Sequence, residues 1–222
     1  EYTEAIKFID IALQKSTWKK QKARLQYIKA QLYEKAGNPD QAAREYAAVL
    51  KLNPEYKMAF NARINAFGIF SGTGDGEKMK KELQKMLKDK KNQEFRDQIH
   101  YALGNIYIAE GNRDQVIDNY RQSVAYSVSN QFQRALSAIT LADLYFEDFN
   151  YRQARAYYDS AMIIIDESYP DYTNLHEKYQ SLANLVDNLV TVEREDSLQK
   201  IAKMPEIERE ALIANLMKEE QE

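Results

Sequence analysis

Apolar residues recur along this chain at a nearly constant interval. One apolar column has steps of 37, 37, 37 and 38 residues: Ile9, Tyr46, Leu83, Tyr120 and Tyr158. A second column lies four residues before each of these positions: Ala5, Ala42, Met79, Val116 and Ala154. Apolar residues four apart share one face of an α-helix. The pattern therefore predicts a helical element that repeats about every 37 residues.

Three further columns describe what precedes this helix in each unit. The aromatic column holds Tyr33, Phe70, Tyr107 and Tyr145, and the column three residues earlier holds Ala30, Phe67, Gly104 and Ala142. The turn column holds Gly37-Asn38, Gly74-Asp75 and Gly111-Asn112, with Asn150 after Phe149 in the fourth copy. Glycine readily adopts the left-handed conformation that ends many helices. Each unit is therefore predicted to be a helix, a turn and a second helix.

The glycine-rich stretch "SGTGDGEK", residues 71–78, falls in the turn column of the second unit. A phosphate-binding P-loop has the pattern GxxxxGK[ST] after a strand. Here the spacing differs, neither Ser nor Thr follows Lys78, and the preceding "AFNARINAFGIF" is a helical pattern. We interpret the stretch as a long turn between two helices, with an anion-binding loop as the alternative.

The columns resemble the tetratricopeptide repeat, and the best match runs from Ala23 to about Tyr56. Two positions depart from that repeat, since Gln26 and Lys29 replace its usual apolar pair. The residues typical of the repeat are Ala30, Tyr33, Ala42, Tyr46 and Pro54. The resemblance covers roughly residues 1–170 and implies an all-α fold, a right-handed superhelical solenoid.

The predicted organisation has three parts. Residues 1–171 form the repeat array, a half repeat followed by four units; residues 172–204 form a long capping helix; and residues 205–222 form a short amphipathic tail helix. The apolar stripe of the capping helix is Leu175, Tyr179, Leu182, Leu185, Val186, Leu189 and Val190. Because the chain begins within the second helix of a unit, we expect further repeats before residue 1.

Residues 192–213, "VEREDSLQKIAKMPEIEREALI", carry a second and narrower resemblance. The segment is similar to the one that follows the repeats in the SprE/PorW lipoproteins of the Bacteroidota type IX secretion and gliding machinery. In that family the stretch Glu195 to Leu198 leads through a Met-Pro pair to a second charged helix. The resemblance implies a location on the periplasmic side of the outer membrane, with a lipid anchor outside this sequence.

Composition and charge exclude several kinds of chemistry. Charged residues make up 29% of the chain and the formal net charge is -3, which argues against a nucleic-acid partner. With no cysteine in the sequence, disulfides and thiolate sites are excluded here. Only two histidines occur, His100 and His176, and neither belongs to a metal-binding or catalytic motif. We therefore expect no enzyme activity, no cofactor, no metal and no transmembrane segment.

The stretch "KMKKELQKMLKDKK", residues 78–91, holds seven lysines. It is predicted to lie on the second helix of its unit, with Met79, Leu83, Met86 and Leu87 forming the buried stripe. The lysines are interpreted as a solvated face. The alternative is a surface for an acidic partner or a membrane.

The concave face of the first helices is the predicted partner-binding groove. In tetratricopeptide repeats, positions 2, 5, 9 and 12 of each unit line that face. The resemblance thereby assigns to it Tyr27, Gln31, Glu34, Ile64, Gln98, Tyr101, Asn105, Ile139, Asp143 and Phe146. The remaining positions of the same register are Arg24, Asn61, Gly68, Ser71, Ile108 and Leu136. Tyr27, Tyr101, Ile139 and Phe146 are expected to be exposed anchors. Basic residues that clamp a peptide carboxylate in chaperone-binding repeats are missing, so chaperone tails are not expected partners.

These features predict a non-catalytic scaffold for protein partners. The tail resemblance implies that the partners are subunits of the type IX secretion or gliding machinery. Two alternatives remain, a repeat adaptor unconnected with secretion and a recruiting domain of a larger enzyme.

Overall fold

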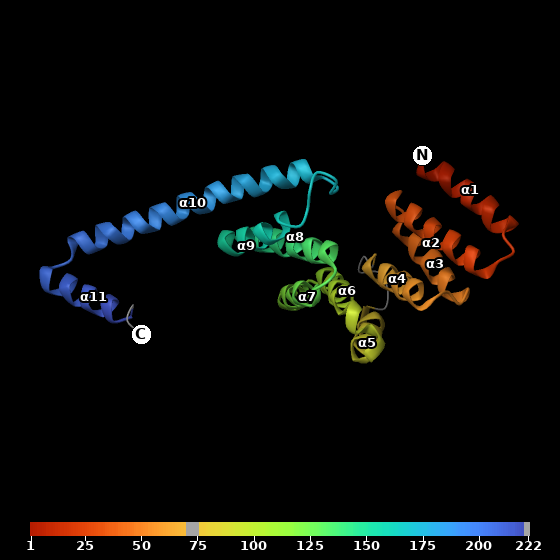
Figure 1. The fold of residues 1–222 in the computed structure, drawn as a ribbon, viewed down its shortest axis with the longest axis horizontal. Coiled ribbons are helices and arrows are strands. Elements are labelled where there is room, and N and C mark those ends of the chain that lie inside the picture. The colour runs from red at the N-terminus through yellow and green to blue at the C-terminus, as the bar shows by residue number, and fades with distance from the viewer. Residues whose placement is uncertain (70–75, 220–222) are drawn as a thin grey trace.

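The computed structural model describes residues 1–69 and 76–219, and within these ranges the chain is helical and has no strand (Figure 1). The helices are α1 (Tyr2–Lys15), α2 (Lys19–Lys35), α3 (Pro39–Lys51), α4 (Tyr56–Gly68), α5 (Gly76–Lys88), α6 (Arg96–Ala109), α7 (Arg113–Tyr126), α8 (Gln131–Glu147), α9 (Tyr151–Met162), α10 (Tyr172–Lys203) and α11 (Glu206–Glu219), with a 3₁₀ helix η1 (Lys90–Phe95) between α5 and α6. Phe70, Gly74 and Asp75, predicted members of the aromatic and turn columns, and Ser71 of the groove register lie outside the described residues.

Successive helices pack side by side into an α-solenoid. Helix α1 packs on α2, while α2 with α3, α6 with α7, and α8 with α9 form closely packed antiparallel pairs. Each pair also contacts the next one along the chain, so the apolar core is a series of clusters between neighbouring helices. The predicted all-α solenoid is confirmed. None of the described helices is long and apolar enough to cross a membrane.

In the first and third units, a backbone hydrogen bond links the turn between the two helices to the tyrosine of the aromatic column. Gly37 and Gly111 have φ of 73° and 70°, the left-handed conformation that the sequence predicted for them. The backbone N–H of the asparagine after each glycine donates to the carbonyl of the tyrosine five residues before it, at 2.9 Å for Asn38 to Tyr33 and 3.0 Å for Asn112 to Tyr107. This hydrogen bond ends the first helix and directs the chain into the second.

Small residues on the first helix let the second helix approach. In the third unit, a Cβ added to Gly104 would lie 2.5 Å from the ring of Tyr120, so only glycine fits there. Ala30 and Ala142 hold the same position in the first and fourth units and are fully buried, as are Tyr46 and Tyr158 on the facing helices. The distance between packed helices depends on the size of the side chains between them. These columns are therefore the packing positions that the sequence indicated.

The second unit departs from this arrangement. Helix α4 packs on α3 and α6, and α5 packs on α6 and η1, but α4 and α5 do not form a close pair. Phe67 stands where the other units have Ala30, Gly104 or Ala142, and Met79 takes the position of Ala42 in the first unit. Both are partly buried against the apolar cluster that α4 and α5 share with α6. Their bulk keeps the two helices apart.

Helix α10 packs on α9 with its first half and extends away from the solenoid with its second half, after which the chain reverses direction into α11 (Figure 1). Leu182 and Val186 are buried against the fourth unit, as the apolar stripe predicted. Leu185, Leu189 and Val190 of the same stripe are exposed. The reason is geometric, because α9 covers only one side of α10.

Candidate protein-binding groove

Five of the ten predicted groove residues line one hollow of about 460 Å³. They are Glu34, Ile64, Gln98, Tyr101 and Asn105. Its remaining lining residues are Asn65, Gly68, Ala102, Phe132, Gln133 and Leu136. The lining comes from α2, α4, α6 and α8, which are the first helices of four consecutive units. The superhelical register thus brings residues more than 100 positions apart to one surface.

Tyrosine hydroxyl groups from the second helices reach through to this surface. The Tyr46 hydroxyl donates to Glu34 Oε2 at 2.9 Å, and the Tyr120 hydroxyl donates to Asn105 Oδ1 at 2.6 Å. Tyr158 makes the corresponding hydrogen bond to Asp143 in the fourth unit. Burial raises the pKa of all three phenols above their ordinary value, so the hydroxyl groups remain protonated at neutral pH. They act as hydrogen-bond donors that orient the polar side chains of the groove.

At the second unit, Gly68 lines the hollow and presents no side chain to it. The same register position holds Gln31 in the first unit, Asn105 in the third and Asp143 in the fourth. A Cβ added to Gly68 would lie 3.7 Å from Asn105 Nδ2, an ordinary van der Waals contact. A larger side chain can therefore enter the hollow from this position without a clash at its base.

Of the four predicted anchors, Phe146 is exposed as expected, and the other three are less exposed than expected. Tyr27, Tyr101 and Ile139 are partly buried, and Ile64 is only 8% exposed. The ring of Tyr27 packs edge-on against that of Tyr46 with centroids 5.3 Å apart, and its hydroxyl accepts from Asn65 Nδ2 at 2.9 Å. These side chains form part of the groove floor, because packing against the second helices occupies one side of each ring.

The other predicted residues do not share the main hollow. Ile139 and Asp143 line a smaller space of about 250 Å³ beneath the start of α10. Asp143 forms an ion pair with Lys178 of α10, and the Lys178 ammonium lies 5.3 Å from the ring centroid of Phe146. Helix α10 thereby occupies part of the surface assigned to the groove in the fourth unit. Gln31 is exposed and lines neither space.

Asn65, Ala102, Phe132 and Gln133 line the hollow but were not singled out from the sequence. Phe132 is 62% exposed and lies in the first turn of α8, before the fourth unit as the sequence delimited it. In the sequence, the signal that could have identified Phe132 was an aromatic residue next to a turn. Asn65, Ala102 and Gln133 could be assigned to the hollow only from the rotation of each helix relative to its neighbours.

The rings of the two histidines pack against tyrosine rings of the protein. His100 Nδ1 lies 3.1 Å from Asn119 Oδ1, and the ring stacks on Tyr126. Burial lowers the pKa of His100 below its ordinary value, which favours the neutral ring. The ring of His176 stacks on that of Tyr172 in the first turn of α10. Within residues 1–69 and 76–219, no cluster of three or more His, Cys, Asp or Glu side chains could hold a metal ion.

Comparison with known families agrees with this geometry. The model of the tetratricopeptide repeat matches residues 23–56 and 97–127, which cover most of α2, all of α3, nearly all of α6 and all of α7. The chain carries tetratricopeptide repeats. Curated proteins gave no match to the chain. Tetratricopeptide arrays are typical scaffolds for protein–protein interaction, and their extended concave surfaces are the usual binding sites.

Proposed function

We propose that this tetratricopeptide array is a non-catalytic scaffold whose groove holds an extended segment of a partner protein. The observation that supports it best is the hollow of about 460 Å³ shared by the first helices of four units. Its lining combines buried and partly buried aromatic and aliphatic side chains with the polar side chains of Gln98, Glu34 and Asn105, the last two of which accept hydrogen bonds from Tyr46 and Tyr120. Apolar floors with a few fixed polar groups are suited to binding a peptide with defined orientation.

The partners that we propose are subunits of the type IX secretion or gliding machinery, on the periplasmic side of the outer membrane. This finer assignment rests on the resemblance of residues 192–213 to the tail of the SprE/PorW lipoproteins. Helix α10 carries this segment away from the solenoid, and its side chains from Thr191 to Lys200 are exposed. The tail is therefore accessible to a partner while the groove holds another.

A pull-down from the detergent-solubilised envelope of the source bacterium tests both parts. The baits are the unchanged chain, Gly68→Gln, which fills the hollow, and a chain truncated after Met204. The matched control is Ala47→Gln, which adds the same side chain at an exposed position of α3. We expect secretion-machinery subunits on the unchanged chain, and their loss with Gly68→Gln but not with Ala47→Gln.

The alternative outcomes are informative. If only the truncation loses these subunits, the tail and not the groove is the binding surface. Recovery of the same unrelated proteins on every bait would contradict the secretion role. In that case the chain remains a repeat adaptor or a recruiting domain whose partner lies elsewhere.

A further inference from the structure

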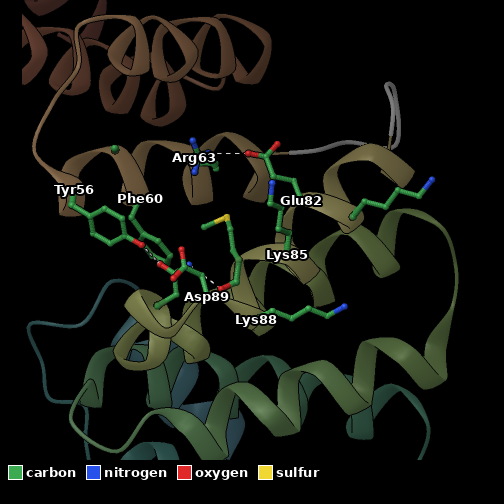
Figure 2. A pocket seen from close by; sticks show the side chains of 11 residues that line it. Tyr56, Phe60, Arg63, Glu82, Lys85, Lys88 and Asp89 are labelled. Atoms are coloured by element: carbon green, nitrogen blue, oxygen red, sulfur yellow. Dashed lines mark hydrogen bonds and ion pairs between the residues drawn. The ribbon is translucent and has the colours of Figure 1, made fainter.

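The second unit contains an open cleft between α4 and α5 of about 840 Å³ (Figure 2). Tyr56, Ala59, Phe60 and Arg63 line it from α4, and Lys81, Glu82, Lys85, Met86 and Lys88 line it from α5, with Asp89 and Asn92 at one end. None of these residues lines the groove hollow. The cleft is therefore a second surface, separate from the proposed partner groove.

The cleft exists because the second unit lacks the packing residues of its neighbours. Phe67 replaces the alanine or glycine of the other three units, Met79 stands where they have Ala42, Val116 or Ala154, and Leu83 replaces their tyrosine. Leu83 is fully buried, but it is shorter than a tyrosine and carries no hydroxyl group that could reach the first helix. The space that a close helix pair would fill remains open to solvent at the ends formed by Tyr56 and Lys88.

The floor of the cleft is apolar. Phe60 and Met86 are 2% and 6% exposed, and the ring of Phe60 stacks on Phe95 with centroids 4.5 Å apart. Tyr56 stands beside them and is 48% exposed, with its hydroxyl donating to Asn92. A rigid, buried floor next to an exposed aromatic ring can take one apolar side chain at little cost in conformational entropy.

The rim of the cleft is basic. Arg63 is neutralised by Glu82, with Arg63 Nε 3.0 Å from Glu82 Oε1, and the two face each other in Figure 2. Lys81, Lys85 and Lys88 are exposed, and within the described residues none of them forms an ion pair. Lys80 differs from them, since it is buried and pairs with Glu77 and Glu110; the prediction of a uniformly solvated lysine face is wrong at this residue.

The Asp89 carboxylate is also engaged, because it accepts from the backbone N–H of Lys91 at 3.0 Å and caps η1. Both acids of the rim thus have partners within the protein. Three ammonium groups are left without a counter-ion around an apolar floor. Such an arrangement is complementary to a ligand that combines carboxylates with one apolar group.

We infer that the α4–α5 cleft binds an acidic peptide segment of a partner protein, which inserts one apolar side chain between Tyr56, Phe60 and Met86 and places its carboxylates against Lys81, Lys85 and Lys88. Nucleic acid fits less well, because the rim contains carboxylates and its single arginine is already paired. A lipid surface fits less well, because the apolar groups lie at the bottom of a concavity and do not protrude.

Fluorescence anisotropy with the whole chain tests the inference. The probe is a fluorescein-labelled peptide with two glutamates on each side of one phenylalanine, and the control peptides replace the glutamates by lysine or the phenylalanine by alanine. We expect binding of the first peptide that weakens as salt is raised, because the ammonium groups are exposed. Both control peptides are expected to bind at least about tenfold more weakly.

Two variants locate the peptide. Lys81→Glu/Lys85→Glu is expected to raise the Kd by about tenfold or more. Its matched control, Lys7→Glu/Lys35→Glu, makes the same change in net charge at exposed lysines of α1 and α2 and is expected to change the Kd by less than about twofold. Ala59→Trp fills the floor without changing the charge and is also expected to abolish binding. Far-UV circular dichroism confirms that each variant remains helical.

Three results would overturn the inference. One is the absence of binding by the acidic peptide, and another is an equal loss with the control lysines. The third is tighter binding of single-stranded DNA or of phosphatidylglycerol vesicles to the same lysines, which would make the cleft a site for a different class of ligand. Gly68→Gln must leave peptide binding unchanged, so failure of the groove proposal and failure of this inference are distinguishable.

Discussion

The second and third units occupy equivalent positions in the repeat pattern but pack differently. In the third unit, Gly104 of α6 lies directly against the ring of Tyr120, and α6 and α7 form a close pair. In the second unit, Phe67 and Leu83 hold these two positions, and α4 and α5 stand apart around an open cleft. The comparison shows that the repeat register sets where helices lie along the solenoid, whereas one small residue per unit decides whether a pair closes.

The irregular unit also contributes to both candidate binding surfaces. Ile64, Asn65 and Gly68 of α4 line the groove hollow, and a different set of α4 side chains, including Phe60 and Arg63, lines the cleft with α5. By contrast, α8 and α9 of the fourth unit form a closely packed pair. Departure from the repeat therefore coincides with both candidate binding surfaces.

Two glycine substitutions provide the strongest test of this comparison. Gly104→Ala is expected to lower the free energy of unfolding by about 2 kcal/mol, because the new Cβ overlaps a fully buried ring. Gly68→Ala is expected to leave stability unchanged or to raise it by up to about 1 kcal/mol, since its Cβ has room and alanine favours the helix. Urea denaturation followed by circular dichroism measures both. Equal losses from the two substitutions would contradict the packing argument.

Removal of one tyrosine hydroxyl group tests the link between the core and the groove. Tyr120→Phe is expected to cost about 1 kcal/mol of unfolding free energy, because Asn105 Oδ1 loses its donor at 2.6 Å. Tyr33→Phe is the control, since its ring is partly buried beneath Lys29 and no hydrogen bond of its hydroxyl is seen within the described residues. A larger loss from the control than from Tyr120→Phe would show that the hydroxyl of Tyr120 does not stabilise the third unit.

The smallest expected effect concerns Asp97, a buried carboxyl at the start of the third unit. Burial raises its pKa above the ordinary value, so the folded protein holds this proton more strongly than the unfolded chain. The contribution of Asp97 to stability therefore falls as pH rises from the unfolded to the folded pKa. Asp97→Asn removes this titration, and the variant is expected to gain stability relative to the unchanged chain as the pH rises above the ordinary carboxyl pKa of about 4.

Thermal unfolding at several pH values measures that difference. The carboxyl also accepts a hydrogen bond from Ser127 Oγ at 3.3 Å, and Ser123 Oγ donates to the Asp97 carbonyl at 2.7 Å. Ser123→Ala is the control, because it disturbs the same polar cluster without removing the titratable group. A pH-independent difference between Asp97→Asn and the unchanged chain would contradict the direction of the pKa shift.

The groove shows how many binding-site residues can be assigned from their position in the repeat alone. Glu34, Gln98 and Asn105 could be assigned from their positions in the repeat, and the structure places them around one hollow. Phe146 and Asp143 were assigned by the same rule, but α10 returns across the fourth unit and contacts both through Lys178. A rule for repeating units contains no information about a helix that lies outside the repeats.

The helices, their turns and the small and aromatic packing columns could be predicted from the sequence, because each depends on residues close together in the chain. Gly37 and Gly111 adopt the predicted conformation since the turn is a local hydrogen-bonded motif. The separation of α4 from α5, the burial of Lys80 and the exposure of the outer half of α10 became visible in the three-dimensional fold and not before. These outcomes depend on whether side chains from different helices fit together, which is a property of shape across the whole solenoid and not of any one segment.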